Sequence, residues 1–572
     1  MTRLRGFQVA WIACTACLVL AISCAPPAGH PPKGPVALTL LQTTDFHGAL
    51  ESESKDRDSG RPIGGAAYLT SVIARERATN PLGTLVLDSG DIYQGTALSN
   101  LTQGRAAIAY MNDAGFDAST IGNHEFDFGI DVMTARIGEA QFPLLCANVV
   151  VKTTREPPSW ARPYVILERE GVRIAVIGLI TPDTPNVTLP ENVAHLDFLD
   201  PIPVANRWIS ELVPRKADLA VIICHMGGFQ DRGGPVEGEL VDLVEGIQGE
   251  SAILGGHTHR LVAGKVGETP VVQAGSSGRW LGRIDLVWDP RTDTVTSSSS
   301  RIITVFADGA GVADGGGSAG GAGSAGGAGS ADGAGSAGGA GGAGGAGGAG
   351  GAGGAGGEDS VQPDADVTRM IASYRGEIAP ILDEQIATAA IDLTAERHEC
   401  TMGNWMCDVI RDAVGADVAF QNPGGVRSSI EAGPVRYADV YRVMPFDNTI
   451  VVAPMTAAEI RSYLETIANR GSFLHVSGLR YTVDLRQPEG ERITALTLSD
   501  GSPLAADRTY AVAVNNFMAQ GGDDLPVLTD LAGTKETGRL IREEMATACR
   551  EATAAGHAIE CKVEGRVTQI RE

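Results

Sequence analysis

The sequence is short of basic residues. It contains 45 lysines and arginines against 69 aspartates and glutamates, so its formal net charge is -24. A nucleic acid held by general electrostatic attraction needs a basic surface, and we therefore expect no nucleic-acid partner. A phosphorylated substrate would also be repelled at long range. Its attraction has to come from a local pocket of metal ions and arginines.

The apolar stretch at the N-terminus falls short of a comfortable membrane span. It covers residues 7–22 and follows Arg3 and Arg5, which is typical of an export signal. Small residues before Cys24 and prolines after it resemble a bacterial lipoprotein cleavage site. We interpret residues 1–24 as a signal peptide with Cys24 lipidated, and an ordinary cleaved signal is the alternative. In both cases we expect an exported protein, periplasmic or on the cell surface, and a lipid anchor would be its only membrane contact.

Cysteine is also scarce, with nine residues in 572. If the signal removes two of them and lipidation uses a third, six remain, an even number in an oxidising compartment. We expect Cys549 and Cys561 to pair, because only a short loop separates them near the chain end. Cys146 and Cys224 lie within apolar strands and are expected to be buried free thiols.

The chain divides at a low-complexity block. Residues 308–357 are almost wholly glycine and alanine, which cannot bury enough apolar surface to become ordered. We predict a flexible linker there, with a root-mean-square span of roughly 40 Å. An inserted repeat without a role is an equally open interpretation. The block separates a first domain, residues 36–306, from a second, residues 363–572.

The two domains differ in their patterns of strands and helices. The first alternates strand-like runs with amphipathic segments, which indicates an α/β or layered α+β core. The second mixes helices and strands, and the spacing of its first apolar residues predicts a helix over 366–383.

Clusters of Asp, Asn and His recur at the ends of five short apolar runs in the first domain. Each run is typical of a buried strand, and functional groups of open α/β sheets gather beyond the carboxyl ends of strands. Oxygen and nitrogen donors suit hard and borderline divalent ions. The donors suffice for two ions sharing one bridge, and two ions about 3.5–4 Å apart are a common device for displacement at phosphorus. The pattern therefore predicts metal-assisted phosphoester hydrolysis by residues within 45–47, 88–91, 122–125, 225 and 255–259.

These metal motifs resemble those of the calcineurin-like metallophosphoesterase superfamily, and the second half resembles the C-terminal domain of the 5'-nucleotidase family. The two halves cover nearly the whole chain apart from the Gly/Ala block. The resemblance implies a four-layer α-β-β-α metallophosphoesterase domain over 36–306. It also implies a separate α+β substrate-binding domain over 363–572, an active site between the two, and rotation of one against the other with the 366–383 helix as a hinge element.

The resemblance further implies two divalent metal ions, zinc or manganese, with Asp91 as the bridge. One ion is expected to take Asp45, His47, Asp91 and His259, and the other Asp91, Asn123, His225 and His257. His124 is expected to stabilise charge on the phosphoryl group or to protonate the leaving oxygen, with Asp127 fixing its tautomer. Asp88 is expected to be structural.

Substrate contacts are implied for the second domain. Glycines let the backbone approach the substrate, and the Arg427 fork matches two phosphate oxygens at once. Phe446 and Phe517 are expected to sandwich the base, because every base has a π face. The family's second phosphate-binding arginine aligns with Glu396, which leaves its neighbour Arg397 as the candidate. The full set is Arg397, Asn422, Gly424, Gly425, Arg427, Phe446, Gly478, Phe517 and Asp523.

The expected function is that of an exported, metal-dependent 5'-nucleotidase that releases nucleoside and phosphate by a two-metal mechanism. A 2',3'-cyclic-nucleotide phosphodiesterase, a UDP-sugar hydrolase or a related thiosulfohydrolase stays open, because an aromatic pair does not separate a cyclic from a terminal phosphate. An alternative of another class is a surface-anchored, non-catalytic binding protein. Loss of catalysis would be expected to erode the metal ligands, and none is missing.

Overall fold

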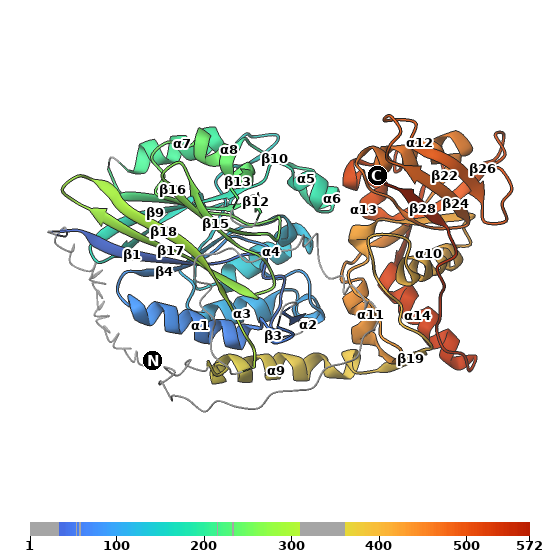
Figure 1. The fold of residues 1–572 in the computed structure, drawn as a ribbon, viewed down its shortest axis with the longest axis horizontal. Helices are drawn as coiled ribbons and strands as arrows, with labels where there is room; N and C mark the ends of the chain where they lie inside the picture. The colour runs from blue at the N-terminus through green and yellow to red at the C-terminus, as the bar shows by residue number, and fades with distance from the viewer. Residues whose placement is uncertain are drawn as a thin grey trace, which may run out of the picture.

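The computed structural model describes residue 32 and residues 34–52, 54–56, 59–213, 215–231, 234–308 and 361–571. The expected signal peptide with Cys24, and residues 309–357 of the expected linker, lie outside these ranges. Within them, no helix combines the length and the hydrophobicity needed to cross a membrane. The described chain forms two bodies, drawn in blue to green and in orange to red (Figure 1).

Two six-stranded sheets form the centre of the first domain, and four consecutive strands in each are parallel. In order, the first sheet contains β18 (Thr294–Thr304), β17 (Trp280–Asp289), β1 (Val36–Thr43), β4 (Thr84–Asp88), β5 (Ala118–Thr120) and β6 (Leu144–Leu145). The second contains β15 (Leu261–Val266), β16 (Thr269–Ala274), β14 (Ala252–Leu254), β11 (Leu219–His225), β9 (Val172–Ile180) and β8 (Tyr164–Arg169).

The central strands are apolar on both faces, and this produces the layers. Alternate side chains of a strand point to opposite faces. Leu40 of β1 and Val221 of β11 are therefore buried between the two sheets. Their neighbours Leu41 and Ile222 lie in the outer layers, where α1 (Ala66–Thr79) and α3 (Arg105–Ala114) cover one sheet, and α7 (Pro201–Leu212) and α8 (Glu239–Gly246) the other (Figure 1). The predicted four-layer α-β-β-α fold is confirmed.

The second domain is an α+β body, also as predicted. Its main sheet orders β23 (His475–Ser477), β20 (Val418–Gln421), β26 (Thr509–Asn515), β22 (Thr449–Thr456) and β27 (Lys535–Leu540). Beside it lies a smaller sheet of β25 (Ile493–Leu498), β24 (Leu479–Asp484) and β28 (Val567–Ile570). Ala419 packs with α10 (Thr401–Val414) and α14 (Ile541–Ala554), whereas Phe420 packs with α12 (Ala457–Asn469). Helices thus cover both faces of the main sheet.

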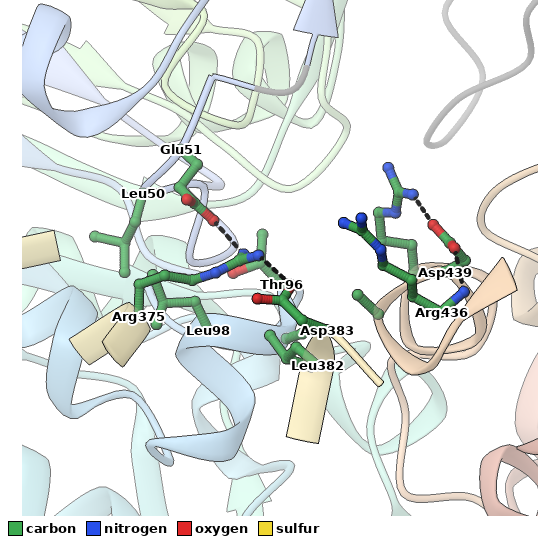
Figure 2. A pocket seen from close by; sticks show the side chains of 12 residues that line it. Leu50, Glu51, Thr96, Leu98, Arg375, Leu382, Asp383, Arg436 and Asp439 are labelled. Carbon is green, nitrogen blue, oxygen red and sulfur yellow. Dashed lines mark hydrogen bonds and ion pairs between the residues drawn. The ribbon is translucent and has the colours of Figure 1, made fainter. Parts of the chain in front are cut away.

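The helix predicted over residues 366–383 is present as α9 (Ala365–Leu382), but it packs on the first domain. It lies along α1 and α3 (Figure 1), and the N–H of Asp364 donates to the Ala67 carbonyl at 2.9 Å. Arg375 binds Glu51 of the first domain at 3.2 Å and Asp383 at 3.0 Å (Figure 2). Any change of angle between the two domains therefore has to occur after α9.

A cavity of about 190 Å³ opens where α9 meets the second domain. Its lining includes Leu98 from α2 (Ala97–Leu101), Arg375 from α9 and Asp439 from α11 (Tyr437–Val443) (Figure 2). None of the predicted site residues lines this cavity, so it belongs to the junction of the two domains and not to the candidate active site.

The expected pairing of Cys549 with Cys561 is wrong. All six cysteines in the described residues are free, and Cys146 and Cys224 are buried, as predicted. Cys549 points into the core beneath α14, whereas the chain leaves that helix and places the Cys561 sulfur 4.0 Å from Asp408 Oδ2. Nearness in sequence does not imply nearness in space when one partner faces inward from a helix.

Candidate metal centre and its substrate-facing loops

The loops that carry the predicted metal ligands follow β1, β4, β5, β11 and β14. Five of the seven ligand candidates have a positive φ, a conformation that non-glycine residues rarely adopt. They are Asp45 (49°), His47 (51°), Asp91 (58°), His257 (74°) and His259 (56°). Strain of this kind costs about 1–3 kcal/mol for each residue and persists only where the surrounding fold imposes it. The backbone is therefore bent at these strand ends in a way that packing alone does not require.

The seven side chains form two adjoining groups of nitrogen and oxygen atoms. In the first, His259 Nε2 lies 3.0 Å from His47 Nε2 and 3.3 Å from Asp45 Oδ1. In the second, the Nε2 atom of His225 is the common centre. Its neighbours are Asp91 Oδ2 at 3.0 Å, Asn123 Oδ1 at 3.1 Å and His257 Nδ1 at 3.3 Å. Asp91 Oδ2 also lies 3.9 Å from His47 Nε2, between the two groups.

The tautomers of two histidines show why a cation fits here. His47 Nδ1 lies 2.8 Å from the Gln94 carbonyl, and His225 Nδ1 lies 2.8 Å from the Ser89 carbonyl. A carbonyl only accepts, so each Nδ1 must carry a proton, and whenever the ring is neutral its Nε2 presents a lone pair. These lone pairs point at carboxylates and at other imidazoles. Lone pairs that converge repel one another unless a cation lies between them, and a backbone carbonyl that orients a histidine is a common support for a metal ligand.

The electrostatics of the centre are consistent with this arrangement. Burial lowers the pKa of His225, but the charge and hydrogen bond of Asp91, together with the charge of Asp45 and the Ser89 carbonyl, raise that pKa to about 10. Burial and the neighbouring His259 lower the pKa of His47 to about 3, and burial with His225 lowers that of His257 to about 4. Within one small volume, some imidazoles thus favour a positive charge and others exclude a proton. A shared divalent cation satisfies both kinds of group.

Two buried carboxylates hold the ligand loops together without facing the ligand groups. Glu125 accepts backbone N–H groups from Asp91 at 2.9 Å and from Gly122 at 2.7 Å, and so ties the loop after β4 to the loop after β5. Asp88 accepts the hydroxyl of Ser119 at 2.7 Å and has the structural position expected for it. The supporting role of Glu125 is not evident from the sequence, where an acidic residue beside ligand candidates suggests one more ligand.

His124 stands beside the two groups and is oriented by Asp127. His124 Nδ1 lies 2.6 Å from Asp127 Oδ2, and the Thr188 hydroxyl donates to the other carboxylate oxygen at 2.8 Å. Burial lowers the pKa of His124, but Asp127 and Asp91 raise it to about 9. On its open side, the ring of Phe446 from the second domain stacks at 6.3 Å between centroids.

Arg427 and its glycine turn lie next to the same histidine. The turn is a short 3-10 helix, Pro423–Gly425, and Arg427 Nη1 donates to the Gly424 carbonyl at 3.3 Å. The guanidinium is centred 5.6 Å over the Phe446 ring, and its positive charge opposes protonation of His124. Burial also lowers the pKa of Arg427 itself. This cation is therefore held partly out of water, where it attracts an anion more strongly.

Three other predicted substrate residues gather where β20 and β26 end. Asn422 Nδ2 donates to Asp523 Oδ2 at 2.8 Å, and Asn422 Oδ1 accepts from Asn515 at 3.0 Å. The Phe517 ring lies flat against Gly522, where an added Cβ would stand 2.4 Å from the ring. Gly425, the second glycine of the turn, also leaves no room for a side chain, because a Cβ there would lie 1.9 Å from the side-chain amide of Gln421.

Gly478 and Arg397 do not join these residues. β23 runs antiparallel to β20 with Ser477 opposite Ala419, so Gly478 lies near the start of β20 and Asn422 follows its end. Gly478 has φ 84°, and a Cβ there would lie 2.2 Å from the Asp417 carbonyl, so the turn itself requires glycine. Arg397 is exposed in the bend before α10. The turn would require glycine here even without a ligand, and a glycine needed by the backbone looks the same in sequence as one needed by a ligand, so the substrate role of Gly478 stays a prediction.

Comparison with known proteins matches both halves of the chain. Residues 38–261 match the calcineurin-like phosphoesterase family, and residues 383–530 match the 5'-nucleotidase C-terminal domain family. The 5'-nucleotidase of Vibrio vulnificus (strain CMCP6) is 28% identical, with 88% of each chain covered. A solved structure of a 5'-nucleotidase precursor from Thermus thermophilus is 27% identical and superposes with a TM-score of 0.74, over 94% of this chain and 100% of that one.

A longer relative matches as well. Endonuclease YhcR of Bacillus subtilis (strain 168) is 26% identical over 85% of this chain, but this chain spans only 37% of that relative. The shared part is therefore a unit that also occurs within larger proteins.

Substitution of Glu125 tests whether this residue holds the two loops of ligand candidates together. Glu125→Ala leaves buried backbone N–H groups of Asp91 and Gly122 without an acceptor, so the two loops should separate. We expect the affinity for a divalent ion to fall about 10- to 100-fold, the usual cost of losing a group that supports metal ligands. Metal content after dialysis against limiting Mn²⁺, measured by mass spectrometry, checks this. Glu211→Ala, an exposed carboxylate on α7, is the control, and equal metal content in both variants would contradict the role of Glu125.

Proposed function

The chain belongs to the calcineurin-like phosphoesterases that carry a 5'-nucleotidase C-terminal domain, a family of phosphoric ester hydrolases, and we propose that it hydrolyses nucleotides to nucleoside and phosphate. One observation carries the proposal. Phe446, the candidate base-stacking residue of the second domain, lies over His124 of the candidate metal centre. An aromatic ring at this place would hold a base while the phosphate of the same molecule reaches the metal ligands.

We assign the metal ligands to the two groups described above. Asp45, His47 and His259 would hold one ion, Asn123, His225 and His257 the other, and Asp91 would contact both. Bound divalent ions would neutralise phosphate charge and activate water for attack at phosphorus. A set of imidazole, amide and carboxylate ligands suits zinc or manganese.

The protein's own side chains supply the remaining steps. His124, held by Asp127, would donate a proton or a hydrogen bond to the oxygen that leaves phosphorus. Arg427 would bind the phosphate through its guanidinium fork. Phe446 and Phe517 would stack on the base, with Asn422 and Asp523 contacting the nucleoside. The turn at Gly424 and Gly425 would let the backbone approach, and the exposed Arg397 is proposed only as a second phosphate contact.

We also propose that the protein is exported. Arg3, Arg5 and the apolar residues 7–22 support a signal peptide, and Cys24 with its small neighbours supports a lipid anchor. The nucleotide substrate would then be met outside the cytoplasm.

The proposed activity predicts metal-dependent hydrolysis of AMP. AMP should release phosphate, a chelator should abolish the release, and added Mn²⁺ or Zn²⁺ should restore it. With the purified protein, we measure phosphate from AMP, UMP from UDP-glucose, 2'- or 3'-AMP from 2',3'-cAMP, and p-nitrophenol from bis(p-nitrophenyl) phosphate. Activity confined to the diesters would keep the metal centre and reject the 5'-nucleotidase assignment. A metal-loaded protein inactive on all four would reject the nucleotide proposal.

The proposed stacking of Phe446 and Phe517 on the base predicts that their loss weakens nucleotide binding and leaves metal binding unchanged. Phe446→Ala combined with Phe517→Ala should raise KM for AMP by a factor of about ten or more, because stacking contributes about 1–3 kcal/mol per base. Metal content should stay unchanged, since neither ring is a ligand. Steady-state kinetics with AMP provide the measurement, and Trp208→Ala, an aromatic residue on α7, is the matched control. An unchanged KM in the double variant would remove the base-stacking part of the proposal.

A further inference from the structure

One buried arginine binds the backbone carbonyls of a short segment of the second domain, Met444–Phe446. Arg542 is 5% exposed at the start of α14, and its guanidinium lies 4.0 Å over the ring of Tyr441. It donates to the Met444 carbonyl at 3.3 Å and to the Phe446 carbonyl at 3.0 Å. A buried arginine with several acceptors fixes the direction of these carbonyls. The segment is therefore rigid relative to its own domain.

The middle carbonyl of this segment is held by the other domain. Pro445 has no N–H, so its carbonyl is its only hydrogen-bonding group. Asn100 Nδ2, on α2 of the first domain, donates to this carbonyl at 2.8 Å. Asn100 is 5% exposed, so the bond lies in a dry environment where a lost partner is costly. The carbonyls of Met444 and Phe446 are thus bound within the second domain, and the carbonyl of Pro445 between them is bound by the first domain.

Asn100 is also joined to the metal-ligand loop. Its Oδ1 accepts the N–H of Gly95, four residues after Asp91, at 2.8 Å. Gly95 is packed so closely on the His47 carbonyl that a Cβ would lie 2.4 Å from that oxygen. One amide side chain therefore connects the loop of two ligand candidates to the backbone of the second domain.

Both ends of the segment adjoin the candidate substrate-binding groups. Phe446 stacks on His124, and the N–H of Arg427 donates to the Val443 carbonyl at 2.9 Å. The base-stacking ring and the phosphate-binding arginine are thus fixed to the same piece of backbone. A displacement of Pro445 would move both away from His124.

We propose that Asn100 is a positioning residue that docks the Met444–Phe446 segment onto the metal domain and thereby sets Phe446 and Arg427 over the metal centre. The proposal rests on the nucleotide function proposed above for the kinetic consequence, but the docking itself does not depend on which substrate is used. In this role Asn100 touches no reacting atom. It acts by fixing the position of the Met444–Phe446 segment.

Two substitutions separate docking from a local role. Asn100→Asp keeps the acceptor for Gly95 and puts a carboxylate against the Pro445 carbonyl, so it breaks the bond that joins Asn100 to this carbonyl. Asn100→Ala removes both bonds. If docking is the role, both variants should raise KM for AMP about tenfold, the aspartate at least as much as the alanine, with kcat changed less. If Asn100 only supports Gly95, Asn100→Asp should behave as the unsubstituted protein.

Asn112→Asp is a matched control in the same domain. Asn112 Nδ2 donates to the Glu139 carbonyl at 3.0 Å, and its Oδ1 accepts the N–H of Gln141 at 2.7 Å, the same pair of bonds away from the domain junction. This variant should keep the KM of the unsubstituted protein. Metal content should be equal in all variants, because no ligand is changed.

Distances between the domains give a readout that does not involve substrate. Spin labels on cysteines introduced at the exposed residues Glu168 and Asp500, one in each domain, should show a broader distance distribution in Asn100→Asp than in Asn112→Asp. An unchanged distribution together with an unchanged KM in Asn100→Asp would overturn the proposal. A broadened distribution in a protein that does not turn over AMP would support docking and count against the nucleotide function, whereas a broadened distribution with an unchanged KM for AMP would overturn the positioning of Phe446 and Arg427 by docking.

Discussion

The structure depends most on the convergence of imidazole lone pairs and carboxylates at the ends of five strands. His47 and His225 each donate one ring N–H to a backbone carbonyl, so in the neutral ring the other nitrogen faces Asp91 and its neighbours as an acceptor. Acceptors packed at about 3–4 Å repel one another in a dry site unless a cation joins them. The left-handed backbone at Asp45 and His257, and the clamp made by Glu125, are the means by which the fold maintains this arrangement.

The division of the chain into two bodies separates two tasks. Ligand candidates extend from strands that are buried between sheet and helix layers, which gives them a rigid base. The candidate substrate-binding residues Phe446 and Arg427 lie on loops of the other body, next to His124 of the candidate metal centre. Helix α9 stays with the first body, so the junction at Leu382–Asp383 and the bond from Asn100 to Pro445 determine how the two parts meet.

The fold class and the gathering of the ligand candidates could be predicted because both rest on local patterns. Doubly apolar strands imply covered sheets, and donors at successive strand ends must meet at one edge. What could not be predicted depends on contacts between distant segments. Arg542 and Asn100 both bind residues 444–446, and no local pattern reveals that. Gly478 and the pair of Cys549 with Cys561 show the opposite limit, because glycine serves turns as well as ligands and sequence neighbours can face different ways.

Anomalous diffraction from crystals grown with Mn²⁺ is the decisive measurement for a shared cation site at these strand ends. We expect two peaks about 3.5–4 Å apart, with a carboxylate oxygen of Asp91 at bonding distance from both. His47, His259 and Asp45 should surround one peak, and His225, His257 and Asn123 the other. A single peak, or two peaks that do not share Asp91, would refute this arrangement.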